Sequence, residues 1–159
     1  MGNNKYLKLH SFLRYGAALI AIIVFISLFT GSKIVHTDFK AVVFDWKEVF
    51  FGNADFKPTV LGFIGYLFVF IGGLAGLAFV FFDELIGKDL TKKLSYVAGI
   101  IMVVGGIFML LTGVVFRAVN HTPAIGDYRL SAETIVYGIL SIVAGFTVFS
   151  AQILENKGY

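Results

Sequence analysis

The sequence predicts an all-α integral membrane protein, a four-transmembrane-helix bundle with a short amphipathic interfacial helix in its first outer loop. Hydrophobic residues make up 58% of the 159 residues and charged residues only 14%, against roughly 45–50% and about 25% in soluble domains. The mean hydropathy is +0.87. The long apolar runs do not alternate with polar residues, as the strands of a membrane β-barrel would.

Four stretches contain no charged residue, namely residues 15–30, 59–82, 94–116 and 134–154, which are 16, 24, 23 and 21 residues long. A bilayer core of about 30 Å requires roughly 20 helical residues. The first run is short, so we expect it to begin near Ser11, with Arg14 extending its guanidinium to the headgroups. The expected helices of this single domain, residues 1–159, are about 11–30, 59–82, 94–116 and 131–154, the last capped by Ser131.

Four crossings place both termini on one side of the membrane. That side holds seven basic residues in about 30, and the other side holds six in about 42. Since basic residues are enriched in cytoplasmic loops, both termini are predicted to be cytoplasmic. The frequent Lys and Asn are typical of a low-GC bacterium, so we expect the bacterial cytoplasmic membrane. We interpret the net charge of +3 as a result of this topology and expect no nucleic-acid partner.

The first outer loop, residues 31–58, contains a helical pattern from residue 38 to residue 51. Apolar residues recur at spacings of three and four, and they are Phe39, Val42, Val43, Trp46, Val49 and Phe50. Asp38 is the expected N-cap and Gly52 the expected stop. The segment is too short to span, so we interpret it as an interfacial helix with Trp46 at headgroup depth. Its apolar face packs on its own bundle, docks a partner or lipid, or simply contacts lipid.

Small residues recur along the predicted helices, as is typical of close helix contacts in lipid. The candidates for helix or partner packing are Gly72, Gly73, Gly76, Gly105, Gly106, Gly138 and Gly145. These glycines pack within one bundle or against another subunit, and the sequence leaves both possibilities open.

Several chemistries are excluded by missing residues. The chain has no Cys, which excludes thiolate metal sites and thiol redox chemistry. No ionisable residue is expected deep in a span, which argues against proton-coupled antiport, and all three histidines fall at or beyond helix ends, which argues against haem. Nucleotide-binding and hydrolase motifs are absent, so we expect no catalytic residue and no cofactor.

The second outer loop carries the densest polar group near a membrane edge. A ligand with a phosphate or carboxylate could bind among its residues, which are Arg117, His121, Asp127, Arg129 and Glu133. The alternative, which we prefer, is that the two arginines are membrane-edge anchors paired to the carboxylates. No metal site is predicted; His36 and His121 are weak candidates because imidazole and carboxylate ligands suit zinc.

The order of four helices, a long first outer loop, a short inner turn and a shorter second outer loop resembles the architecture of claudin-like tetraspan proteins. This chain lacks the cysteine pair of their first outer loop, that loop is shorter, and Trp46 alone does not make their motif. The resemblance therefore implies an arrangement of helices and no function.

These observations predict a non-catalytic accessory or scaffolding subunit of a membrane complex. It would contact lipid and other membrane subunits, or a second copy of itself, through the glycine-lined faces and the loop helix. One alternative is a homo-oligomeric pore or a carrier of a lipid or small ligand, with Ser141, Thr147 and Gln152 facing a shared axis. Another is an outer-face enzyme or headgroup-binding protein using Arg117, His121, Arg129 and Glu133.

Overall fold

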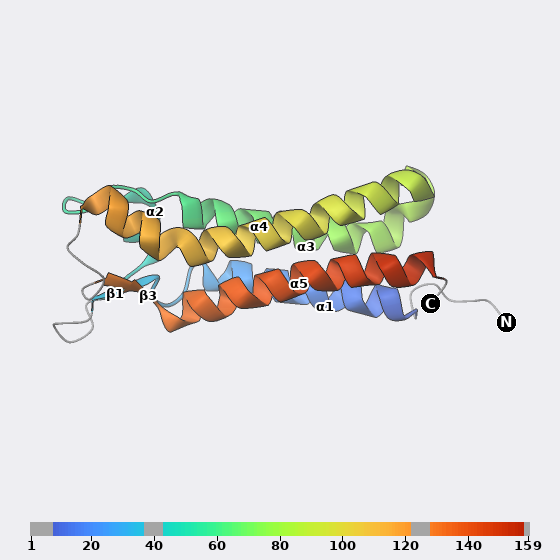
Figure 1. Cartoon of the computed structure of the whole chain (residues 1–159), viewed down its shortest axis with the longest axis horizontal. Helices are drawn as coiled ribbons and strands as arrows, with labels where there is room; N and C mark the ends of the chain where they lie inside the picture. Colours follow the sequence, from blue (N-terminus) through green and yellow to red (C-terminus); the bar gives the residue numbers. More distant parts are fainter. Residues whose placement is uncertain (1–7, 37–42, 122–127, 158–159) are drawn as a thin grey trace.

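The computed structural model describes residues 8–36, 43–121 and 128–157, without the side chains of residues 83, 84 and 86. Four long helices run side by side along the molecule (Figure 1). They are α1 (Leu9–Ser27), α3 (Leu61–Ile86), α4 (Lys88–Asn120) and α5 (Ala132–Asn156). All four contain a segment long and apolar enough to cross a membrane, which confirms the predicted helical bundle.

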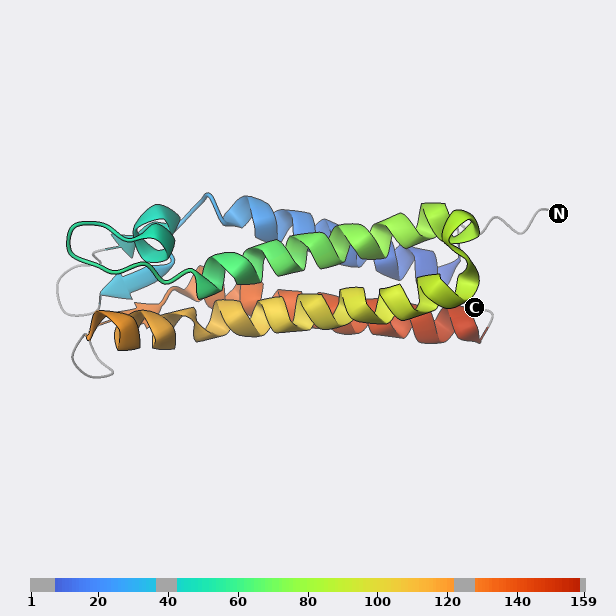
Figure 2. The same ribbon diagram turned by 90° about the horizontal axis from the view of Figure 1, so that it is seen from above.

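The helices form a closed ring in which α1 packs on α3, α3 on α4, α4 on α5, and α5 on α1. Both termini of the described chain lie with the α3–α4 turn at one end, here called the terminal end, and α2 with the α1–α3 and α4–α5 connections lies at the other, here called the loop end (Figure 2). Apolar side chains such as Val24, Met102, Met109 and Val148 are fully buried along the axis of the ring.

Three reciprocal glycine pairs bring the helix backbones together: Gly65–Gly105 between α3 and α4, and Gly99–Gly145 and Gly106–Gly138 between α4 and α5. A Cβ atom added at Gly105 would lie 2.6 Å from the carbonyl oxygen of Gly65, and the reverse distance is also 2.6 Å. The two pairs between α4 and α5 are seven residues apart on each helix, and their order shows that the helices are antiparallel. Side chains larger than hydrogen would separate these helices.

The turn between α3 and α4 is much tighter than predicted. The predicted helices end at residue 82 and begin again at residue 94, which leaves residues 83–93 as a loop, but α3 continues to Ile86 and α4 begins at Lys88. Gly87 alone joins them, with φ +88°, a conformation that glycine adopts without steric cost. The charged residues of this segment therefore belong to the end of α3 and the start of α4, beyond the apolar region.

A small antiparallel sheet covers the loop end and was not predicted. Strand β1 (Ile34–His36) pairs with β2 (Val43–Phe44) on one side and with β3 (Tyr128–Leu130) on the other. In register, Ile34 lies opposite both Phe44 and Leu130. The sheet therefore joins the first outer loop to the second.

The predicted loop helix over residues 38–51 is wrong in extent. The part of it that the structure describes contains strand β2, followed by α2 (Trp46–Phe51), which has only six residues; Phe39 and Val42 lie outside the described residues. Asp45 supplies the N-cap, accepting from the Lys47 and Glu48 backbone amides in a capping box. This cap starts the helix seven residues later than the expected Asp38, whereas Gly52 ends it as expected.

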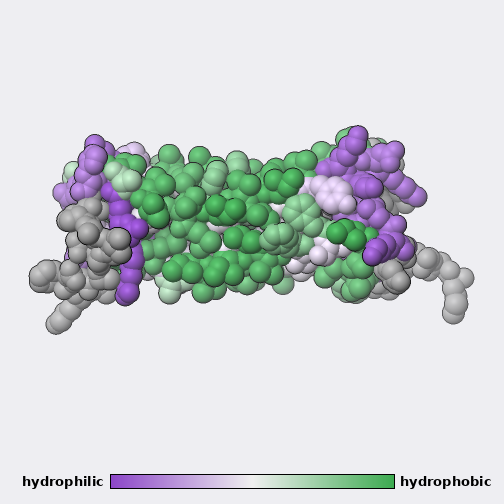
Figure 3. Space-filling model, viewed as in Figure 1, coloured by the Kyte–Doolittle hydropathy of each residue, from purple (hydrophilic) through white to green (hydrophobic). Residues whose placement is uncertain are grey.

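On the face shown in Figure 3, apolar residues cover the middle of the bundle as a band and hydrophilic residues gather at both ends. The exposed side chains of the band include Leu19, Ile71, Val114 and Ile139. This distribution is the reverse of a soluble protein and is typical of a surface solvated by lipid tails.

Candidate functional site

The predicted outer-face ligand site is not assembled among the described residues. The Arg117 Nη1 donates to the Tyr128 carbonyl at 3.1 Å and so fixes β3 against α4. Arg129 is exposed in the middle of β3, and His121 is exposed at the left-handed C-cap of α4. Asp127 lies outside the described residues. Arg117 therefore has a structural partner that accounts for its position, although the partner is a carbonyl rather than the expected carboxylate.

Glu133 lies instead beside Lys33, a residue that the sequence analysis did not single out. Lys33 is 1% exposed, and its Nζ donates to the Ser27 and Thr30 carbonyls, each at 2.6 Å. The same Nζ lies 5.6 Å from the centre of the Tyr66 ring. The amine thus binds the carbonyl end of α1, where the helix dipole favours a cation.

Burial lowers the pKa of Lys33 from its ordinary value of 10.5 to about 8, although the carboxylates of Glu133 and Asp45 act in the opposite direction. The backbone of the same residue joins the sheet, since its amide donates to the Phe44 carbonyl and its carbonyl accepts from Ser131. Lys33 therefore connects α1, the sheet and the start of α5. We interpret it as a structural cation.

The two histidines considered as metal ligands belong to different elements at the loop end. His36 packs its ring edge-on against Tyr128, with ring centres 4.7 Å apart, and His121 caps α4. Within residues 8–36, 43–121 and 128–157, no group of three or more His, Cys, Asp or Glu side chains is placed to hold a metal ion.

The predicted packing glycines all face helices of the same chain. Besides the three reciprocal pairs, Gly72 lies against Ala98 and Met102 of α4, Gly73 against Ala21 of α1, and Gly76 near Val148 of α5. These close contacts lie inside the bundle, so the seven glycines do not present a free face to a partner helix.

An apolar groove of about 550 Å³ opens at the loop end between α1, α2 and α3. We call it the aromatic groove, and its lining includes Phe25, Phe29, Trp46, Phe51 and Phe63. The rings contact one another edge to face: the ring centres of Phe29 and Trp46 are 5.3 Å apart, and those of Phe51 and Phe63 are also 5.3 Å apart. Lys47, the only charged residue among the described residues of the lining, has its Nζ 5.7 Å from the centre of the Trp46 ring.

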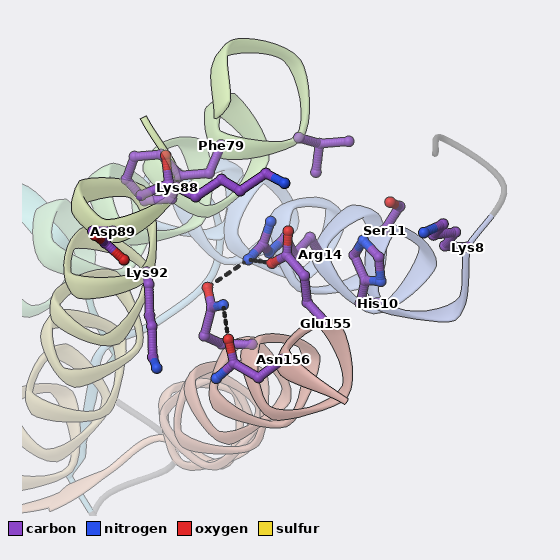
Figure 4. Close-up of a pocket in the computed structure, with 13 residues that line it drawn as sticks. Lys8, His10, Ser11, Arg14, Phe79, Lys88, Asp89, Lys92, Glu155 and Asn156 are labelled. Carbon is purple, nitrogen blue, oxygen red and sulfur yellow. Dashed lines mark hydrogen bonds and ion pairs between the residues drawn. The ribbon is translucent and has the colours of Figure 1, made fainter. Parts of the chain in front are cut away.

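A second, polar pocket of about 490 Å³ lies at the terminal end, between the start of α1, the α3–α4 turn and the end of α5. We call it the terminal pocket (Figure 4). Arg14 lines it and is 1% exposed, so its guanidinium is enclosed by the bundle instead of extending along the outer surface as expected. Its Nη2 donates to Gln152 Oε1 and Glu155 Oε2, each at 2.8 Å, and lies 3.3 Å from Ser95 Oγ.

A signal for this buried arginine exists in the sequence. Arg14, Ala17, Ala18 and Ala21 recur at helical spacing on one face of α1, and that face is buried. Gln152, which we considered as pore-lining, is buried on α5 and binds this arginine.

Comparison of the chain with protein-family models, with curated proteins and with solved structures finds no match.

Proposed function

We propose that this chain is embedded in a membrane with both termini cytoplasmic, and that it is a non-catalytic accessory or scaffolding subunit of a membrane complex. The apolar band and the four long helices support membrane insertion. Lys88, Lys92, Lys93 and Lys157 all lie at the terminal end, which favours a cytoplasmic terminal end by the positive-inside rule.

The observation that carries the proposal is the aromatic groove, which replaces the glycine faces as the proposed contact surface. Phe29 and Phe51 remain 52% and 54% exposed although they contact neighbouring rings. Exposed, preformed aromatic surfaces with a Trp are typical of the energetic centres of protein interfaces. An aromatic girdle at the headgroup level is the simpler alternative.

The proposed occupant is a membrane-spanning helix of another protein. The groove continues into a stripe of exposed side chains along α1 and the turn that follows it, formed by Leu19, Ile23, Ile26 and Phe29. From Leu19 to Phe29 the stripe extends over ten residue steps, or about 15 Å at 1.5 Å per residue. A helix lying on this stripe would place its end against Trp46.

No observation favours the pore. Its expected polar stripe requires Ser141, Thr147 and Gln152 to face a shared axis, but Ser141 and Gln152 are buried inside the chain's own bundle. The Ser141 hydroxyl donates to the Tyr137 carbonyl, and that of Thr147 donates to the Val143 carbonyl. These side chains have partners without a second copy.

A photocrosslinking residue placed at Phe51 in cells tests the proposal, with the same residue at Ile139 as the matched control. Ile139 is 50% exposed on α5. We expect one defined protein adduct from position 51, no such adduct from position 139, and loss of the adduct with Phe29→Ala. Adducts with lipid alone would support the carrier alternative, and equal protein adducts from both positions would refute the groove as the interface.

A further inference from the structure

The terminal pocket has the chemistry of an anion site. Among the described residues, six charged side chains line it, four cationic and two anionic: Lys8, Arg14, Lys88, Lys92, Asp89 and Glu155. Figure 4 shows Lys88 of α4 and Arg14 of α1 on facing sides of this space. The carboxylate of Glu155 is bound to the buried guanidinium.

Two buried polar atoms of the pocket lack partners. Among the described residues, the Nε of Arg14 and the Oγ1 of Thr91 are buried without any hydrogen bond. All three acceptors of Arg14 share its Nη2, a nitrogen with two protons. Buried donors are normally satisfied, so these atoms indicate a missing acceptor in this pocket.

The start of α4 adds a third source of positive potential. Its N-cap is Gly87, which has no side chain, and no side-chain hydrogen bond caps the helix. The first-turn residues Lys88 and Asp89 line the pocket together with Thr91. Uncapped amides and the helix dipole favour an anion, although Asp89 offsets part of this potential.

The depth of the pocket matches the headgroup layer. Arg14 contacts Ser95, which follows Lys92 and Lys93 and is the second residue of the charge-free run of α4. The pocket therefore lies where the apolar band ends. Basic pockets between membrane helices at this depth bind phosphate-bearing headgroups.

We infer that the terminal pocket binds a phosphate group, which bridges Arg14, Thr91, Lys88 and Lys92. The phosphate belongs to an anionic lipid headgroup or to a soluble phosphate ester, since the two share the recognised chemistry. The arginine supplies the directed hydrogen bonds and the two lysines supply charge.

The test uses the whole chain in a neutral detergent. Binding of short-chain phosphatidylglycerol, short-chain phosphatidylcholine and glycerol 3-phosphate is measured by native mass spectrometry. Lys88→Gln with Lys92→Gln removes two pocket cations without touching the Arg14–Glu155 pair. Lys93→Gln with Lys157→Gln is the matched control, because both are exposed at the same end and neither lines the pocket.

For a lipid headgroup, we expect phosphatidylglycerol to bind about thirtyfold more weakly to the pocket pair and within about twofold of wild type to the control pair. For a soluble ester, glycerol 3-phosphate shows this pattern instead. Three results would overturn the inference. The first is equal affinity of the two variant pairs for both phosphate compounds, and the second is equal binding of phosphatidylcholine and phosphatidylglycerol without any binding of glycerol 3-phosphate. The third is no binding at all.

Thr91→Val provides a second readout that does not depend on net charge. Valine has a similar shape and removes a buried hydroxyl that has no partner, so the ligand-free protein should melt at a higher temperature. The same variant should weaken phosphate binding about fivefold. A higher melting temperature with unchanged affinity would show that Thr91 does not contact the ligand and would contradict its assignment to the site.

Discussion

Replacing Gly105 by alanine tests whether the glycine faces hold this bundle together. The new Cβ would lie 2.6 Å from the carbonyl oxygen of Gly65, 2.9 Å from Val69 Cγ2 and 3.0 Å from Phe68 Cβ. An ordinary contact begins at 3.4 Å, so α3 and α4 must separate by about 0.8 Å. The close contact is with backbone, which cannot move to another rotamer.

Gly16→Ala is the matched control, because Gly16 is also helical and a Cβ there meets nothing within 4 Å. Both substitutions gain the helix propensity of alanine, about 1 kcal/mol, so this gain cancels in the comparison. What remains is the packing cost at Gly105, typically 1–3 kcal/mol for an overpacked core. We therefore expect Gly105→Ala to be less stable than Gly16→Ala by about that amount.

Reversible unfolding in mixed micelles, followed by circular dichroism of the helices, measures the free energy of unfolding of both variants. Equal stability of the two would refute the intramolecular packing at this position. If Gly105→Ala kept full stability but released a partner from the intact assembly, the glycine face would instead be an intermolecular surface.

Three further predictions use the same unfolding measurement. Arg14→Met should lower the free energy of unfolding by about 2–3 kcal/mol, which is less than the 3–5 kcal/mol typical of a fully buried pair, because Glu155 is 28% exposed. Adding Glu155→Gln to this variant should recover part of the loss. Additive losses in the double variant would contradict the pairing. The pKa of Lys33 is lower in the folded state, so the contribution of Lys33 to stability should increase as the pH rises from about 8 to 10.5. Lys33→Met should remove this increase. A pH profile of stability that is unchanged in Lys33→Met would contradict the lowered pKa. Ser131→Ala should cost about 1–2 kcal/mol, since the hydroxyl caps α5 and donates to the Ser32 carbonyl at 2.6 Å; a change below about 0.5 kcal/mol would be that of an ordinary surface position.

The four helices could be predicted from the local sequence alone, because three of the charge-free runs are as long as a bilayer requires and the first reaches that length when it is extended to Ser11. The sheet could not be predicted in the same way. Strand β1 has three residues, and its partner β3 lies more than ninety positions away, so tertiary pairing rather than local propensity creates it. The period-three pattern around Val43 favoured a helix, but pairing with Val35 holds this residue extended.

The Tyr66 ring beside Lys33 and all three acceptors of Arg14 also come from distant parts of the chain. Lys33 binds carbonyls of the preceding helix end and lies over Tyr66, and no spacing rule connects these residues. Arg14 was more accessible to prediction, because it shares a helical face with small residues that pack inward. A cation on an inward face is buried with a partner, and an arginine on a lipid-facing one extends to the headgroups.

These two cations limit how the bundle can sit in a bilayer. Arg14 and Ser27, whose carbonyl binds Lys33, are thirteen residues apart on α1, or about 20 Å, whereas the hydrocarbon core is about 30 Å thick. In a bundle that spans such a core, at least one cation would therefore lie level with the lipid tails and would need to be solvated by the protein. Lys33 is held by two carbonyls and an aromatic ring, but the guanidinium of Arg14 retains an unpartnered donor beside a polar pocket. The terminal end, rather than the loop end, is therefore where an additional anion would complete the solvation of a buried charge. Because the aromatic groove lies at the opposite end, loss of anion binding and loss of a partner can be measured independently.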